Sequence, residues 1–351
     1  MRVAGSPEPR VTIADVARLA GVRPSTVSKV LNDGRGSPDV RRRVEAAVAQ
    51  LDYRPNRQAR GLRRSESRSI GVFVPDLANP VFLPFLRGVE QVAHERGYVV
   101  LIADGQRSAA AQEAALERFF DQGVDGLILA GSATKASLDM YVEHGVPVAP
   151  SVADYDRGLA RHWEQGEAQA TRDMATRLIE LGHRRVAFVS PPAPQGQQGR
   201  RLRQGRLGNL AMLFRDANAQ VDIHVVDPAR GADAARDELR AVAESHVTAF
   251  VCGSHLLAPW LLLALDDSRI RLPRDASLVV YGDSDWARAY RPALSVVSRD
   301  TYAEGMTLAT WLLDTLAGAD VEAPAGISSA YVERRSTGRP RALDDPGPSA
   351  R

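Results

Sequence analysis

The chain has 351 residues, more than a single hydrophobic core usually holds, so we expect two or three domains. Its 44% hydrophobic and 25% charged residues are typical of a soluble globular protein and exclude an intrinsically disordered chain. The single cysteine, Cys252, excludes an internal disulfide framework and a cysteine-rich metal site. The first ten residues lack the apolar centre of a secretory signal and no run is as long as a membrane span, so we expect a cytoplasmic protein.

The positive charge is concentrated at the N-terminus, although the formal net charge of the chain is only +2. Residues 1–64 contain fourteen Arg or Lys and six Asp or Glu, a balance of +8, and the rest of the chain carries −6. A basic segment attached to a near-neutral body indicates a polyanionic partner.

Residues 11–51 have the pattern of three short amphipathic helices. Apolar residues fall at helical spacing over 13–20 and again over 27–31. Between them, Gly21 can adopt the left-handed conformation that ends a helix, and Pro24 suits the first turn of the next helix. The pattern predicts a helix-turn-helix, followed by a third helix over about 38–51. Residues 53–56 break that helix, and 57–63 are long enough for barely two further turns.

After a polar linker at 64–69, strand-like runs alternate with amphipathic helices. The expected strands are 70–74, 99–103, 126–129, 186–189, 223–226 and 249–251, and the expected helices lie around 83–96, 109–122, 168–181, 207–217 and 232–243. Such alternation predicts parallel sheets with helices on both faces. Two series of similar length predict two lobes, with a ligand cleft between them at the carboxyl ends of the strands.

Several motifs resemble those of the LacI/GalR family of repressors. The close matches are Val11–Ala17, Gly21-Val22, Ser25–Asn32, Leu51–Asn56, Ala59-Arg60 and Leu62, and looser ones are Asp125–Ile128, Leu181–Arg185, Leu272-Pro273, Ser277-Leu278 and Pro292–Leu294. The resemblance spans about 11–340. It implies an all-α DNA-binding headpiece, a hinge helix, and an α/β core of two doubly wound parallel-sheet lobes, like a periplasmic binding protein. It also implies a homodimer on a near-palindromic operator, controlled by a small-molecule effector.

The expected domain boundaries follow from this resemblance. Residues 1–10 form a disordered N-terminus, 11–56 the headpiece, 57–69 the hinge helix and linker, 70–340 the core, and 341–351 a disordered tail. Because the chain of such a core crosses between its lobes three times, lobe 1 takes about 70–166 and 298–326, and lobe 2 about 167–297 and 327–340.

The second helix of a helix-turn-helix lies in the major groove, with its early residues at the base edges. Val27, Val30 and Leu31 then face the core. The DNA-contacting residues expected from the headpiece are Thr12, Arg23, Pro24, Ser25, Thr26, Ser28, Lys29, Asn32, Tyr53 and Asn56. Pro24 and Ser25 are the pair expected to select bases, and Thr26 and Asn32 are expected on phosphate. The run Arg41–Arg43 is either a solvated face or a phosphate contact.

In the family the hinge helix docks into the minor groove, and here it supplies Arg57, Ala59, Arg60 and Leu62. The resemblance places Leu62 as a wedge between base pairs, and such wedges kink the duplex. The alternative is an ordinary linker leucine. Because Gly61 weakens an isolated helix, we expect the hinge to become ordered only on DNA, paired with its copy from a second subunit.

The expected effector contacts lie at strand ends: Asp76, Asn79, Phe82, Ser132, Arg206, His255 and Asp283. Arg206 aligns with an arginine that holds a hydroxyl or carboxylate in relatives, a role suited to its forked donors. His255, Gly282 and Gln165-Gly166 replace acidic or amide residues of the family. Since these groups accept hydrogen bonds from sugar hydroxyls, we expect an effector other than a plain sugar: a less hydroxylated or anionic ligand, or no strong ligand.

Two other classes of protein agree less well with the sequence. An enzyme would require a phosphate loop from Gly196, Gly199, Gly205 and Gly208, but no Gly-Lys-Ser/Thr follows them, or a nucleophilic Cys252 partnered by His255. A secreted solute-binding protein would require a signal peptide and has no use for a basic headpiece. We therefore expect no catalytic residue, no metal site, no cofactor and no membrane partner.

Overall fold

The computed structural model describes residues 11–33, 35–53, 66–106, 108–130, 135–150, 157–192, 197–227, 232–322, 324, 327 and 329–340. They divide into two compact units between Ser67 and Arg68, and each unit is described by itself. Residues 57–63, expected to form the hinge, lie outside the described residues.

The headpiece consists of α1 (Ile13–Ala20), α2 (Pro24–Asp33) and α3 (Pro38–Gln50). Asp15 accepts hydrogen bonds from the backbone N–H and the hydroxyl of Thr12, which holds the start of α1. Gly21 ends α1 at φ +64, a conformation that costs glycine little. The small core between the helices is made by Val16, Ala17, Ala20, Val27, Val30, Val44 and Ala47.

Lobe 1 of the core is built on a four-stranded parallel sheet in the order β2-β1-β3-β4. Its strands are β1 (Ser69–Val74), β2 (Val99–Asp104), β3 (Gly126–Leu129) and β4 (Val148–Pro150). One face packs on α6 (Ala109–Asp121) and α7 (Lys135–Glu143), and the other on α5 (Phe82–Glu95) and α13 (Thr301–Leu316). Helices thus cover both faces of the sheet.

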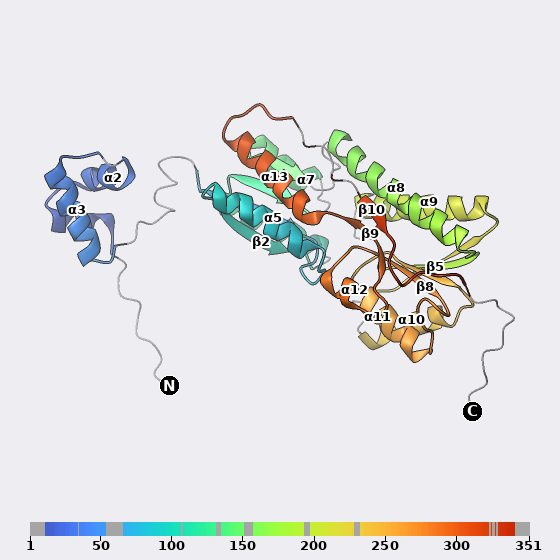
Figure 1. The fold of residues 1–351 in the computed structure, drawn as a ribbon. Coiled ribbons are helices and arrows are strands. Elements are labelled where there is room, and N and C mark those ends of the chain that lie inside the picture. Colours follow the sequence, from blue (N-terminus) through green and yellow to red (C-terminus); the bar gives the residue numbers. More distant parts are fainter. Residues whose placement is uncertain are drawn as a thin grey trace, which may run out of the picture. The chain divides into compact units, whose positions relative to one another are not determined.

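Two glycines let α5 and α13 lie in direct contact, as Figure 1 shows. A Cβ on Gly88 would collide with the carbonyl oxygen of Tyr302, and a Cβ on Gly305 with that of Phe85. Because neither glycine has a side chain, the backbones of α5 and α13 pack directly against each other. The two helices are more than two hundred residues apart in sequence, and together they cover one face of the lobe 1 sheet.

Lobe 2 is built on a six-stranded sheet in the order β10-β9-β8-β7-β5-β6, in which only β10 is antiparallel to its neighbour. Its strands are β5 (Arg185–Ser190), β6 (Gln220–Val225), β7 (Ala249–Cys252), β8 (Ser277–Tyr281), β9 (Ser295–Arg299) and β10 (Ser329–Val332). On one face lie α8 (Arg157–Glu180) and α9 (Gln197–Asp216); on the other lie α10 (Ala232–Ala243), α11 (Ala258–Asp267) and the short α12 (Asp285–Ala289).

The chain crosses between the lobes three times: from β4 to α8, from β9 to α13, and from α13 to β10. The expected fold class is confirmed by the two parallel-sheet lobes and the helical headpiece. Two helices expected at 168–181 and 207–217 were predicted too short, since α8 begins at Arg157 and α9 at Gln197. Gly199, Gly205 and Gly208 therefore lie within a helix, and in the described backbone their spacing forms no phosphate loop.

Candidate nucleic-acid interface and effector site

The second headpiece helix presents a polar surface at its start. Val27 and Val30 are buried, whereas Pro24, Ser25 and Lys29 are exposed. Arg23, which precedes the helix, is exposed, and Thr26 and Ser28 are half-buried. This split follows from the 3.6-residue period, which turns successive early residues of α2 toward solvent and its valines toward α1 and α3.

Other residues expected on DNA have structural partners within the headpiece. The hydroxyl of Thr12 donates to Asp15, 2.7 Å away, and Tyr53 packs against the headpiece core. Arg42 and Arg43 form ion pairs with Asp39 at 3.3 and 3.5 Å, so part of the arginine run on α3 is neutralised. For Asn32 the structure describes only the backbone, and Asn56, Arg57, Ala59, Arg60 and Leu62 lie outside the described residues.

In lobe 2, Arg206 lies in a pair with Glu167 that the sequence analysis did not anticipate. Arg206 extends from α9, and its Nε and Nη2 donate to the two carboxylate oxygens of Glu167 on α8 at 2.6 and 2.8 Å. Its Nη1 donates to the carbonyl of Gly253 at 3.1 Å, and the guanidinium carbon lies 4.5 Å from the centre of the Tyr281 ring. The hydroxyl of Tyr281 is in turn 2.8 Å from that of Thr171.

Both members of this pair are held in their charged forms. Burial alone would raise the pKa of Glu167, but the charge and hydrogen bonds of Arg206, with a smaller contribution from Arg299, keep that pKa below its usual value. Burial alone would lower the pKa of Arg206, but the Glu167 carboxylate raises it. Burial raises the pKa of Tyr281 to about 12, so its hydroxyl remains protonated at neutral pH.

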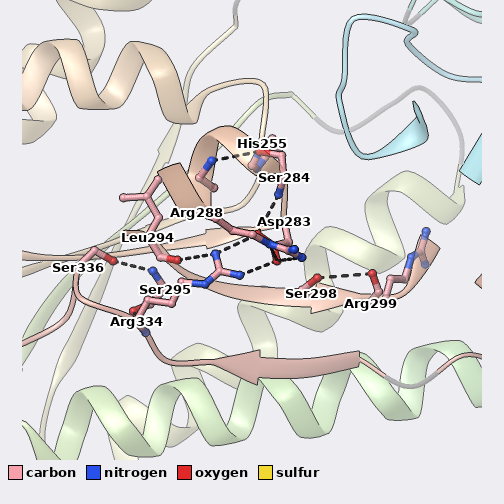
Figure 2. Close-up of polar contacts among 11 residues, drawn as sticks. His255, Asp283, Ser284, Arg288, Leu294, Ser295, Ser298, Arg299, Arg334 and Ser336 are labelled. Carbon is pink, nitrogen blue, oxygen red and sulfur yellow. Dashed lines mark hydrogen bonds and ion pairs between the residues drawn. The ribbon is translucent and has the colours of Figure 1, made fainter. Parts of the chain in front are cut away.

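Asp283 lies immediately after β8 and is bound by two arginines (Figure 2). Arg334, just after β10, donates to its two oxygens at 2.9 and 2.6 Å, and Arg288 of α12 donates at 3.1 and 2.8 Å. Burial would raise the pKa of Asp283, but hydrogen bonds from Arg334 and Arg288 lower it. The expectation that Asp283 contacts an effector stays a prediction, and this geometry gives both carboxylate oxygens to the protein itself.

His255, at the end of β7, is 2% exposed and lies against α12. Its Nε2 is 2.8 Å from the hydroxyl of Ser284, and its ring centre is 4.7 Å from that of Trp286. Burial lowers the pKa of His255 to about 4, partly offset by Asp283 and the Gly282 backbone. The imidazole is therefore neutral at physiological pH.

The residues expected from lobe 1 shape the turn between β1 and α5. Asp76 accepts a hydrogen bond from the backbone N–H of Ala78 at 2.9 Å, and Asn79 from that of Val81 at 3.3 Å. Phe82 begins α5 and packs on its apolar cluster. Ser132 lies outside the described residues.

Lobe 2 approaches this turn at Gly282, which has φ +100. A Cβ on Gly282 would lie 2.6 Å from Cγ1 of Val81. A side chain at Gly282 therefore requires a displacement of Val81.

Glu167, Tyr281 and Arg334 were missed by the sequence analysis. Glu167 lies just after Gln165-Gly166, in a part of α8 that the apolar pattern did not assign to a helix. Gln165 stands where the family usually has an acidic residue, so the carboxylate of Glu167 two residues later was the sequence signal that could have identified it.

Within the described residues, no group of three or more His, Cys, Asp or Glu is arranged to hold a metal ion. No helix of that part of the chain combines the length and the apolar character needed to cross a bilayer.

Comparison with protein families matches the headpiece and the two-lobed core. Residues 12–56 match "Bacterial regulatory proteins, lacI family". Residues 70–252 match "Periplasmic binding protein domain", and residues 175–337 match "Periplasmic binding protein-like domain". The chain is 28% identical over 336 residues to catabolite control protein A of Staphylococcus xylosus, covering 93% of this chain and 99% of that protein. It is 29% identical over 336 residues to the HTH-type transcriptional repressor PurR of Salmonella paratyphi B, covering 93% of this chain and 96% of PurR.

Solved structures agree with these sequence matches. The lac repressor dimer bound to operator and the anti-inducer ONPF has a TM-score of 0.75 at 26% identity, covering 94% of this chain and all of that one. The complex of the transcriptional regulator CelR with cellobiose has a TM-score of 0.61 at 28% identity, covering 93% of this chain and all of that one.

Proposed function

This chain belongs to the LacI family of bacterial regulatory proteins, and from that premise we propose that it is a cytoplasmic, sequence-specific transcriptional repressor without enzymatic activity. It binds a near-palindromic operator as a homodimer, and a small molecule held between the lobes of its core modulates that binding. The observation that carries the proposal is the basic headpiece whose α2 exposes Pro24, Ser25 and Lys29.

The exposed start of α2 is suited to the major groove. A helix fits that groove, and short polar side chains near its N-terminus reach base edges. We propose that Ser25 selects bases, that Lys29 supplies a flexible positive charge and that Arg23 supplies a long donor just before the helix; all three are exposed. The rest of the +8 charge of residues 1–64 provides phosphate attraction that does not depend on sequence.

Dimerisation follows from the expected hinge. A seven-residue helix over 57–63 is marginal alone in water, so we propose that two hinges order each other in one minor groove, with Leu62 of each subunit inserted between base pairs. A two-fold protein dimer then requires two half-sites related by the same symmetry.

The effector is proposed to contact Arg206 in lobe 2 and the turn at Asp76, Asn79 and Phe82 in lobe 1, with His255, Asp283 and Ser132 around it. Two of these side chains already form hydrogen bonds within the protein: Asp283 with Arg334 and Arg288, and His255 with Ser284. The remaining N–H groups of Arg206 are the strongest candidates for a ligand contact.

The test begins with a genome-wide pull-down of DNA fragments bound by the full chain, followed by gel shifts on the recovered site. Ser25→Ala is expected to relax the preference at one base position of each half-site, with a loss of about 1–3 kcal/mol per half-site on the preferred sequence. Arg42→Ala on α3 is the matched control, because removing a surface charge weakens binding to all sequences alike. Recovery of fragments with no shared palindromic motif would overturn the proposal.

A further inference from the structure

Arg206 and Glu167 form a neutral pair within lobe 2. The two N–H···O bonds run in parallel from one guanidinium edge to one carboxylate, at 2.6 and 2.8 Å. The side chains are 25% and 16% exposed, so the pair is largely shielded from water but not sealed from a ligand. A bidentate guanidinium–carboxylate pair is also the geometry by which a protein arginine binds the carboxylate of a ligand. Glu167 therefore occupies the place that the acidic group of a ligand would take.

We propose that Glu167 determines the charge class of the effector: it covers the anion-binding edge of Arg206 and excludes ligands that would present a carboxylate or phosphate there. The group received beside the pair is uncharged, such as a hydroxyl or an amide. This inference rests on the proposed function, which places the effector at Arg206, and it does not favour the anionic ligand considered from the sequence.

The hydrogen-bonding capacity of the pair supports an uncharged group. A guanidinium has five N–H donors, and three are used by Glu167 and the Gly253 carbonyl. The remaining N–H groups can donate, and each Glu167 oxygen retains a second lone pair that can accept. A hydroxyl or amide both donates and accepts. An anion offers only acceptors and brings its charge next to that of Glu167.

Glu167 is held firmly enough to resist displacement. It lies on α8, whose next turns pack Ala170 and Met174 into the core of lobe 2. Its pKa is lowered, so it remains ionised at neutral pH. An incoming anion would leave this carboxylate without its strongest partner in a shielded site, and an unpaired charge is costly there.

The test is chemical rescue in the full-length protein, with acetate as the probe. Glu167→Ala removes the carboxylate and leaves Arg206 unpaired, so free acetate is expected to bind in its place. Thermal unfolding and calorimetric titration with sodium acetate are compared with sodium chloride at equal ionic strength. We expect the variant to bind acetate at least about tenfold more tightly than wild type and to regain part of its lost Tm.

Matched controls separate this site from other basic surfaces, including the headpiece. Glu180→Ala removes the same charge from the same helix, at a side chain that is 60% exposed and pairs with Arg177, and it should show no acetate rescue. Glu167→Ala combined with Arg206→Gln should lose the rescue. If Glu167→Ala does not fold, Glu167→Ser gives the same comparison, because it also removes the carboxylate and leaves its space open to acetate.

Acetate binding by wild type that disappears in Arg206→Gln would overturn the proposal, since the native site would then accept anions. Absence of rescue in a folded Glu167 variant would also overturn it, because Arg206 would then not be available as an anion site. Failure of the proposed function is a separate result, since loss of operator recognition would be seen in gel shifts that need no ligand.

Discussion

His183 offers a direct test of how lobe 2 is held together. Its side chain is fully buried, with Nδ1 2.9 Å from the hydroxyl of Thr248 and Nε2 2.8 Å from that of Ser277 and 2.9 Å from the carbonyl of Gly338. The histidine of the Leu181-Gly182-His183 motif thus ties the end of the described chain to β8. We consider the change His183→Gln, which keeps a polar side chain and removes titration.

The magnitude follows from the pKa. Burial lowers the pKa of His183 from 6.5 to about 4, so the folded protein binds fewer protons than the unfolded chain between these values. The neutral histidine therefore contributes stability that is fully present above about pH 6.5 and is lost as pH falls through about 4. The complete loss is about 3 kcal/mol, of which about 2 kcal/mol is already gone at pH 5.

The assay is equilibrium urea unfolding of wild type and His183→Gln at pH 7 and pH 5. At pH 7 the variant should be less stable, because three hydrogen-bonding partners lose the imidazole. At pH 5 the difference in the free energy of unfolding should shrink by about 2 kcal/mol. His255 titrates in both proteins and cancels in the comparison, and His144→Gln at an exposed position is the control. An equal difference at the two pH values would refute the reasoning.

Three further predictions concern DNA binding and the approach of the lobes. Operator affinity should fall about a thousandfold between 50 and 200 mM salt, because DNA binding releases counterions. An affinity in gel shifts that does not change with salt would contradict the proposed DNA binding. Leu62→Ala should abolish specific operator binding while circular dichroism shows a folded core, and unchanged affinity would contradict the hinge interpretation. Gly282→Ala should lower Tm more than Gly97→Ala: both residues have positive φ, but a Cβ meets Val81 only at Gly282 and nothing within 4 Å at Gly97. Equal losses would show that Val81 yields without cost.

Turn residues and the apolar period of the sequence were sufficient to predict most helices and strands of the fold. Gly21 and Pro24 located the turn of the headpiece, and the apolar period gave α10 with both ends correct. The LacI/GalR resemblance is confirmed by the family matches over residues 12–56. The apolar pattern failed at the beginnings of α8 and α9, where the sequence is rich in glycine, arginine and glutamine and shows no helical apolar period.

The site was less accessible to sequence reasoning because its contacts join distant segments. His255 and Asp283 follow β7 and β8 as expected, and their contact with an effector stays a prediction. Of the two arginines that bind Asp283, however, Arg334 lies fifty-one residues further along, and no local spacing predicts that pair. Arg206 was identified from its alignment with a family arginine, but its pairing with Glu167 depends on how α8 and α9 pack together.

The contact between α5 and α13 has a consequence for synthesis of the protein. A ribosome makes the chain from the N-terminus, so α13 follows all of β5–β9 even though it covers the sheet of lobe 1. Until then, the apolar side chains of Phe85 and Val89 lack their helical partner. The nascent lobe 1 must wait for most of lobe 2 to be translated, and during that interval its uncovered face is a natural target for chaperones.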